Sequence, residues 1–227
     1  MSDPALADRL DEIRAVVATR QQAGGWTHPV RIVAVTKGHG PWAVTAAAGA
    51  GLDAVGENRV QEALAKQEQC AGVSIAWHLI GTLQKNKARL ATARFEMIHS
   101  IDRPDLALEV ARRTPAGARQ LVLVQVNCSD ETQKGGVRPG DLAALLDGMR
   151  ALPSLELRGL MTIAEFSDDE RVQRAAFGRL RTLRDAMIRE GHQLAELSMG
   201  MSGDYGAAVE EGATMLRLGS ILFGPRT

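Results

Sequence analysis

The chain has 227 residues, of which 45% are hydrophobic, and its 27 basic and 27 acidic residues give a formal net charge of zero. This length is close to the roughly 250 residues typical of one (β/α)₈ barrel, and the apolar content is ample for a large core. The charge balance argues against nucleic acid or an anionic membrane as a partner.

The sequence also argues against a membrane protein and a secreted one. No apolar run reaches the ~18 residues of a membrane span, and the acidic, helical start MSDPALADRLDEIR does not resemble a signal peptide. Two cysteines, Cys70 and Cys128, are too few for a disulfide framework and are expected to be free thiols. These features predict a soluble protein of the cytoplasm.

Strands and helices are expected to alternate along the whole chain. A helix at 4–22 comes first. Eight short β-favouring runs follow, at 30–36, 52–57, 75–81, 96–101, 120–127, 157–163, 194–199 and 215–221. Helical segments separate them, most clearly at 104–113, 139–152 and 168–191. Asp168 is the expected N-cap of the last helix, and Gly191 its expected stop.

This alternation predicts βαβ units and a parallel sheet, and eight units favour a closed (β/α)₈ barrel of the TIM type over an open doubly wound sheet. Little sequence follows the eighth strand, so the helix at 4–22 is expected to fill the place of an eighth outer helix. No linker or composition shift divides the chain. We therefore expect one domain over 1–227, with residues 1–25 forming a helix that packs on a barrel of residues 30–227.

Active sites of such barrels lie at the C-terminal ends of the strands. Lys37 follows the first strand directly and is flanked by Gly38 and Gly40. One interpretation is a solvated lysine whose stem lies along the surface. The other is an amine at the barrel mouth, where partial desolvation favours the neutral form that attacks an aldehyde to form a Schiff base. The glycines would let a bulky ligand approach the backbone.

Arg217 lies within the eighth strand, in the segment MLRLGS. It alternates with Met215 and Gly219, so these three residues share one face of the strand. If the intervening leucines pack against the outer helices, the guanidinium points into the barrel, where an unpaired charge is costly. It would then form an ion pair with Glu57 or Asp204, or donate to a ring nitrogen or an anion.

Two small-residue stretches follow strands seven and eight, at Ser202-Gly203 and Gly219-Ser220. Each composition is common in turns. Together they lie where barrels usually bind phosphate, and Gly203 precedes a helical segment whose free amides favour anions. The pair predicts a phosphate cup made of backbone N–H groups and two hydroxyls.

Other polar residues give weaker evidence for a functional site. His78 and His99 lie in strands and are expected to be hydrogen-bonded core histidines. No His, Cys, Asp or Glu cluster has metal-ligand spacing, so no metal is expected, and P-loop and hydrolase-elbow motifs are absent. Lys134 lies in a flexible loop and is either solvated or a gate for a ligand.

Seven blocks of the sequence resemble one known family in order and spacing. They are AVTKGHG (34–40), VGENRVQE (55–62), WHLIGTLQKNK (77–87), IHSIDR (98–103), VNCSDETQKGGV (126–137), LRGLMTI (157–163) and LSMGMSGDYGAAVEEGATMLRLGSILFG (197–224). The family is that of the pyridoxal-phosphate homeostasis proteins, also called proline synthetase co-transcribed homologues. Its barrel resembles the N-terminal domain of alanine racemase.

The resemblance implies a pyridoxal 5′-phosphate (PLP) site. It implies that Lys37 holds PLP as a Schiff base and that Arg217 faces the pyridine nitrogen. The residues implied to hold the phosphate are Ser202, Gly219 and Ser220, and those implied to line the cofactor are Asn58, Met199 and Met201. The chain departs from the family pattern in two places. Around Lys37 the family often has Ser before the lysine and Thr-Lys after it, whereas here Thr36 precedes and Gly38-His39 follows; and Arg59 stands where an aromatic residue is common.

Three functions are weighed. The first is a PLP-binding protein that buffers the cofactor and supplies it to apo-enzymes. The second is a PLP-dependent amino-acid racemase, which needs a second acid–base group that racemases take from another domain; here the sole tyrosine, Tyr205, follows strand seven. The third is a Schiff-base aldolase, whose lysine would lie on a late strand. Without the racemase's second domain, a monomer is expected.

Overall fold

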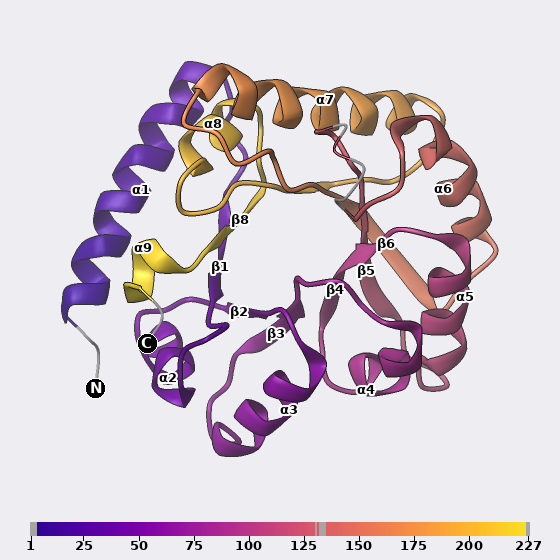
Figure 1. Ribbon diagram of the computed structural model, residues 1–227, viewed down its shortest axis with the longest axis horizontal. Helices are drawn as coiled ribbons and strands as arrows, with labels where there is room; N and C mark the ends of the chain where they lie inside the picture. Colours follow the sequence, from indigo (N-terminus) through magenta and orange to yellow (C-terminus); the bar gives the residue numbers. More distant parts are fainter. Residues whose placement is uncertain (1–3, 130, 132–134, 226–227) are drawn as a thin grey trace.

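The computed structural model describes residues 4–129, 131 and 135–225, and it confirms the predicted parallel barrel. The eight strands are β1 (Arg31–Val35), β2 (Ala54–Glu57), β3 (Ala76–Leu79), β4 (Met97–Ile101), β5 (Gln120–Gln125), β6 (Leu155–Met161), β7 (Glu196–Ser198) and β8 (Met215–Leu218). They pair in chain order, and parallel pairing of β1 with β8 closes the barrel (Figure 1).

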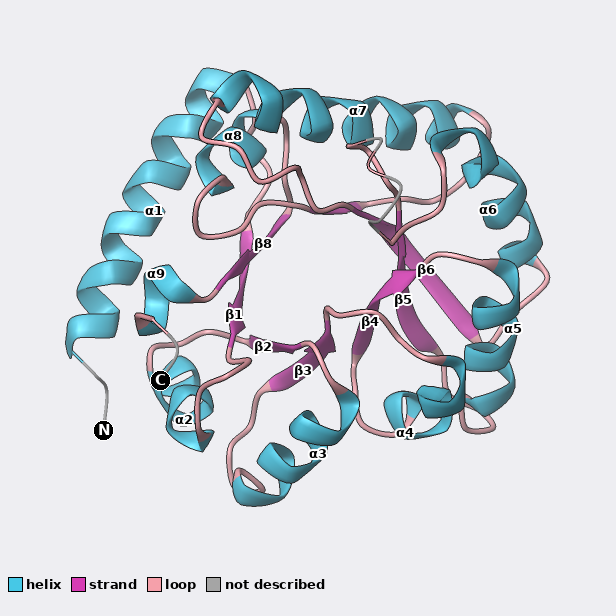
Figure 2. Ribbon diagram, in the orientation of Figure 1, coloured by secondary structure: helices cyan, strands magenta, loops and turns pink. Residues whose placement is uncertain are grey.

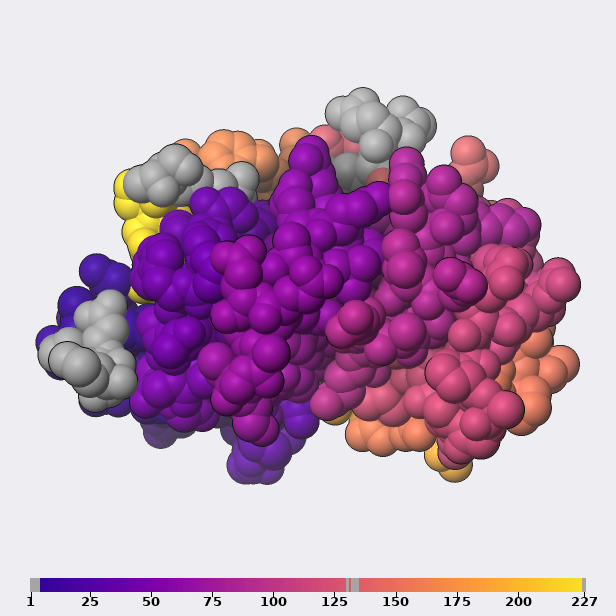
Figure 3. Space-filling model, turned by 90° about the horizontal axis from the view of Figure 1, so that it is seen from below, coloured from indigo at the N-terminus to yellow at the C-terminus, as the bar shows by residue number. Residues whose placement is uncertain are grey.

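Helices form a ring outside the strands (Figure 2). They are α1 (Pro4–Gly24), α2 (Pro41–Gly49), α3 (Val60–Gln69), α4 (Ala88–Thr92), α5 (Pro104–Arg113), α6 (Leu142–Arg150), α7 (Glu170–Arg189), α8 (Tyr205–Glu210) and α9 (Ser220–Phe223). Short 3₁₀ turns at Lys85–Lys87 and Pro139–Asp141 precede α4 and α6. Seen from the side of α2–α4, the outer surface is a continuous wall that hides the barrel interior (Figure 3).

Helix α1 takes the place that the short α9 leaves beside β8. It contacts α8 and α9, and it runs along that side of the barrel in Figure 1. Its Leu6, Leu10 and Ile13 side chains are buried in the core, and Arg9 Nη1 donates to the carbonyl oxygen of Leu222 at 2.6 Å. The expected role of the N-terminal helix is therefore confirmed.

The core has two parts, as expected for a filled barrel. The larger part lies between the strands and the helices and includes Leu216 and Leu218. The smaller part fills the barrel interior with Val33, Ala54, Met97, Leu123, Met161 and Met215. The alternation predicted for β8 is confirmed, because Met215 points inward while the two leucines point outward. Among the described residues, no helix is both long and apolar enough to span a membrane.

Two predicted boundaries were wrong for a reason that the structure shows. Strand β8 ends at Leu218, because the Leu222 and Phe223 N–H groups donate to the Gly219 carbonyl and start α9 where a strand was expected. The N-cap of α7 is Asp169 rather than Asp168, since the Asp169 side chain accepts from the Arg171 N–H.

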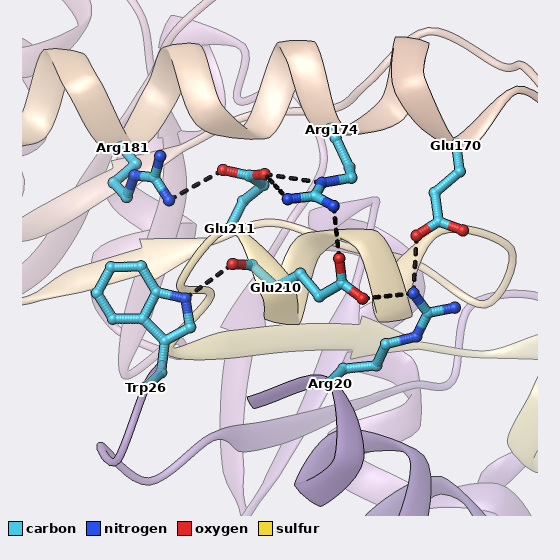
Figure 4. Close-up of polar contacts among 7 residues, drawn as sticks. All are labelled: Arg20, Trp26, Glu170, Arg174, Arg181, Glu210 and Glu211. Carbon is cyan, nitrogen blue, oxygen red and sulfur yellow. Dashed lines mark hydrogen bonds and ion pairs between the residues drawn. The ribbon is translucent and has the colours of Figure 1, made fainter. Parts of the chain in front are cut away.

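An ion-pair network joins α7 to the end of α8 (Figure 4). Arg174 contacts Glu210 at 2.7 Å and Glu211 at 2.8 Å, while Arg181 contacts Glu211 at 2.9 Å. Glu211 is buried, so its charge needs these two partners. The network holds α8 against α7.

The same network reaches α1. Arg20 contacts Glu210 and, at 2.8 Å, Glu170 of α7. The Trp26 indole Nε1 donates to the Glu210 carbonyl at 2.8 Å, and the Arg181 guanidinium lies 5.5 Å from the centre of the Trp26 ring. Three helices distant in sequence are thereby fixed together (Figure 4). Because α8 follows the Ser202-Gly203 stretch, this bracing also sets the position of the loop after β7.

Replacing Glu211→Ala should lower the free energy of unfolding by about 1–2 kcal/mol, since two partly exposed arginines lose their buried partner. Urea denaturation measures the change. The matched control is Glu62→Ala, whose partner Arg59 is exposed, and it should cost about 0.5 kcal/mol or less. Equal losses in the two variants would contradict the role of the network.

Candidate functional site

A cavity of about 780 Å³ lies at the C-terminal ends of the strands. This volume is within the range of small-molecule sites. The structure brings most of the predicted site residues to it: Lys37, Asn58, Met201, Ser202, Arg217, Gly219 and Ser220 all line the cavity. These residues come from the ends of β1, β2, β7 and β8, which are neighbours only because the barrel closes.

The backbone before Lys37 is held by a buried polar cluster. The Thr36 hydroxyl donates to Glu57 Oε1 at 2.6 Å, and Lys66 Nζ donates to the same oxygen at 2.5 Å and to the Thr36 carbonyl at 2.8 Å. Glu57 is fully buried and Lys66 is 8% exposed. Helix α3 thus supplies a cation that neutralises the carboxylate at the end of β2 and binds the Thr36 carbonyl, while the carboxylate binds the Thr36 hydroxyl. Lys37, part-buried, then extends from a fixed backbone.

Replacing Lys66→Met should lower the free energy of unfolding by about 3 kcal/mol, because it leaves the Glu57 charge buried without its cation. The double variant Lys66→Met/Glu57→Gln should recover about half of this loss, since the introduced amide carries no charge but still accepts from Thr36. Urea denaturation of the wild type and the two variants measures both effects. A double variant no more stable than Lys66→Met would contradict this pairing.

Asn58 is placed by a close approach of two backbones. A Cβ atom added at Gly81 would lie 2.3 Å from the Asn58 carbonyl oxygen, so only glycine fits there. The Gly81 carbonyl also accepts from the Ser100 hydroxyl at 2.7 Å. The loop after β3 therefore presses the loop after β2 into position, and Asn58 lines the same cavity as Lys37.

The predicted phosphate cup is formed by the loops after β7 and β8. Ser202 Oγ accepts from the backbone N–H of Gly219 at 3.2 Å and of Ile221 at 3.3 Å, which joins the two loops. Gly203 has open space where a side chain would lie, and with Ser220 it completes the wall of small residues. The donor set consists of hydroxyls and backbone N–H groups, which suits a phosphate.

Arg217 lines the cavity and is 3% exposed. Its Nη1 donates to Ser198 Oγ and its Nη2 to the Thr162 carbonyl oxygen, both at 2.8 Å. Burial lowers the pKa of Arg217 to about 10, against the opposing effect of the Asp204 carboxylate. The group therefore stays cationic near neutral pH.

The ion pair considered between Arg217 and Glu57 does not form, because Glu57 is bound by Lys66 and Thr36. Asp204 influences the arginine electrostatically, and its side chain accepts from the Met201 N–H instead. The direct hydrogen-bond partners of Arg217 are thus neutral oxygen atoms. This leaves the guanidinium as a positive donor at the cavity.

His78 and His99 are fully buried, as expected of core histidines. His99 Nε2 lies 3.1 Å from His78 Nδ1, and His99 Nδ1 lies 3.0 Å from Ser198 Oγ. Ser198, which links these histidines to Arg217, was not predicted from the sequence. Inward alternation along β7 and β8 could have indicated it.

Protein stability should fall as pH drops below 6.5, the ordinary histidine pKa. Burial, followed by the charges of His78, Arg217 and Arg31, holds the pKa of His99 well below that value. Below pH 6.5 the unfolded chain therefore binds a proton that the folded chain does not bind. The free energy of unfolding then falls by up to about 1.4 kcal/mol per pH unit. Urea denaturation from pH 7.5 to 5.5 measures this slope.

The variant His99→Gln should reduce the slope without abolishing it, because burial also lowers the pKa of His192. An unchanged slope in His99→Gln would contradict the assignment.

Two predicted residues lie elsewhere. Met199 is fully buried in the outer core and is not among the residues that line the cavity, because strand alternation turns it away from the interior. Lys134 lies outside the described residues. His39 lines the cavity instead, with its ring centre 5.7 Å from Trp42 and 5.5 Å from Phe223.

Another part of the cavity wall is polar and comes from the end of β5, the loop after β6 and the start of α7. Gln125, Glu165, Asp168 and Gln173 line it, and the adjacent Phe166 is 97% exposed. None of these was predicted from the sequence as a cavity residue, because Glu165 and Asp168 lie in a loop without strand periodicity and no motif marks Gln125 or Gln173. Within the described part of the chain, no group of three or more His, Cys, Asp or Glu residues could hold a metal ion.

A (β/α)₈ barrel with a lysine and two loops of small residues around one cavity at its C-terminal mouth is the class of protein that the fold and the site define. Comparison with known proteins narrows this class. The family model for the alanine racemase N-terminal domain matches residues 9–227. The pyridoxal phosphate homeostasis protein of Pseudomonas aeruginosa is 42% identical over 223 residues, covering 97% of this chain and 96% of the relative.

Solved structures agree. PipY of Synechococcus elongatus with PLP bound superposes with a TM-score of 0.85 at 38% identity, over 96% of this chain and 100% of PipY. Alanine racemase of Clostridium difficile shares the fold, with a TM-score of 0.74 at 15% identity, over 95% of this chain and 57% of the racemase. This chain belongs to the pyridoxal phosphate homeostasis proteins, within the family of the alanine racemase N-terminal domain.

Proposed function

We propose that this protein binds PLP as a Schiff base on Lys37 and acts in PLP homeostasis by buffering and supplying the cofactor. The observation that carries the proposal is the cavity itself, which gathers an amine, an anion cup and a buried guanidinium. Relatives at about 40% identity are named pyridoxal phosphate homeostasis proteins, and PipY is a structural neighbour with PLP bound.

The residues present fit the cofactor. PLP, when bound, supplies an aldehyde that condenses with an amine with loss of water, and a ring that withdraws electrons when its nitrogen is protonated. Lys37 supplies the amine. Ser202, Gly219 and Ser220 hold the phosphate, while Asn58 and Met201 border the ring.

Arg217 decides what chemistry the site can support. Its pKa of about 10 keeps it protonated near neutral pH, so it would donate a hydrogen bond to the ring nitrogen of bound PLP and leave that nitrogen unprotonated. An unprotonated ring withdraws electrons weakly. This argues against transamination and decarboxylation and favours storage over catalysis.

The alternative is an amino-acid racemase, which an unprotonated ring still permits. Racemisation needs acid–base groups on both faces of the substrate carbon. Lys37 is one candidate, but Tyr205, the sole tyrosine of the chain, is not among the residues that line the cavity. We therefore propose no robust catalysis. A Schiff-base aldolase is disfavoured because Lys37 follows β1 rather than a late strand. We further propose a monomer of the cytoplasm that delivers PLP to apo-enzymes.

Adding PLP to the purified protein should produce a visible absorption band that Lys37→Ala lacks. The control Lys85→Ala should retain the band, because Lys85 lies at the surface beside Asp105. Pyridoxal, which has no phosphate, should bind at least about a hundredfold more weakly, because two or more charge-assisted hydrogen bonds are lost. Absorption titration gives all three results.

A wild-type spectrum equal to that of free PLP would contradict the cofactor site. A band retained in Lys37→Ala would contradict the role of the lysine. Loss of optical rotation from L-alanine in the presence of the PLP-loaded protein would contradict the non-catalytic role and favour the racemase.

A further inference from the structure

A row of hydrogen-bonded polar side chains crosses the barrel interior beneath the cavity. It runs from Arg217 through Ser198 and His99 to His78, with successive distances of 2.8, 3.0 and 3.1 Å. At its far end, His78 Nε2 lies 3.8 Å from a carboxylate oxygen of Glu96. Glu96 precedes β4 and is half-exposed, so this row of side chains connects the cavity floor with the N-terminal mouth of the barrel.

Arg217 and Glu96, at the two ends of this row, set the direction of every hydrogen bond between them. Arginine only donates, so Ser198 Oγ accepts from Arg217. The Ser198 hydroxyl then has its own proton to give to His99 Nδ1, and His99 Nε2–H donates to His78 Nδ1. The remaining His78 proton sits on Nε2, which faces Glu96.

The opposite direction fails at the far end. If His99 Nδ1 donated to Ser198, His78 Nδ1 would donate to His99 and the bare His78 Nε2 would face the Glu96 carboxylate. Two lone pairs would then oppose each other. The geometry favours a proton at this place: His78 Nε2 lies 3.8 Å from a Glu96 carboxylate oxygen, which attracts an N–H and repels a lone pair.

We propose that Ser198, His99 and His78 are positioning residues for Arg217, forming a one-directional relay that aims its guanidinium at the cavity and links its charge to Glu96. In this direction each relay member turns a lone pair toward Arg217 and a proton toward Glu96. The aligned dipoles stabilise a buried cation that lacks a carboxylate in direct contact. Contacts to the bound ring rest on the proposed function; the relay itself does not.

The relay limits which ligand groups can bind at the ring end of the cavity, the part beside Arg217. Arg217 stays a donor, with its Nη2 held by the Thr162 carbonyl and its Nη1 by Ser198. A ligand there must present an acceptor, such as an unprotonated ring nitrogen, and a ring bearing N–H at this place would be excluded. The relay thus sets ligand specificity at the ring end, away from the phosphate cup.

The first test is ¹⁵N NMR of the histidine rings in the full chain without ligand, assigned with His99→Gln and with His192→Gln as a buried histidine outside the relay. The relay predicts the Nε2–H tautomer for both His78 and His99, with Nδ1 bare. An Nδ1–H tautomer on either ring would overturn the proposed direction.

The second test is PLP affinity. Ser198→Ala and His99→Leu should weaken PLP binding about tenfold or more, since each disturbs a charge-assisted hydrogen bond or its support. His99→Gln, which can accept from Ser198 and donate to His78, should restore most of the affinity. His192→Leu should match wild type. Competition by inorganic phosphate should be unchanged in all variants, because the relay does not contact the cup.

Unchanged PLP affinity in both Ser198→Ala and His99→Leu would overturn the relay. If His99→Leu does not fold, Ser198→Ala and His99→Gln decide the matter. If wild-type protein binds no PLP, the proposed function fails, and the tautomers alone decide the relay.

Discussion

Pairing of β1 with β8 is the constraint on which the site depends. Val33 lies opposite Arg217 in this parallel register, so a residue near the start of the chain and one near its end share one closed sheet. Closure brings Lys37 beside the loops of the phosphate cup, which follow β7 and β8. Helix α1 packs outside the β1–β8 pair. The ion-pair network around Glu210 and Glu211 joins this helix to α7 and α8. The cavity therefore depends on the pairing of β1 with β8.

Two cations are buried near the cavity, and the protein compensates them differently. Lys66 has a carboxylate in direct contact, Glu57, and the pair fixes the backbone before Lys37. Within the described residues, Arg217 donates its hydrogen bonds to neutral oxygen atoms, with Asp204 acting electrostatically. The first arrangement immobilises structure, because its charges satisfy each other. The second leaves a guanidinium able to donate to a ligand, and this difference suits the roles proposed for the two ends of the site.

Much of this was predictable from the sequence, because strand periodicity and the position of residues after strands are local signals. The barrel, the inward direction of Arg217 and the gathering of Lys37 with the small-residue loops follow from those signals. The partners of Arg217 did not follow, because contacts across the barrel depend on the stagger between strands. No local signal marks Lys66 as buried, and the strand predicted to reach residue 221 ends at Leu218, because α9 begins at Ser220. The family role of each site residue came from resemblance and stays a prediction.

The most direct test of the PLP site on Lys37 is to incubate the protein with PLP, reduce it with borohydride and map the modified peptide by mass spectrometry. Borohydride converts the reversible Schiff base into a stable amine, so the label marks the lysine that held the cofactor. We predict a phosphopyridoxyl group on Lys37 alone. A label on another lysine, a label spread over several surface lysines, or no label would contradict the proposed site.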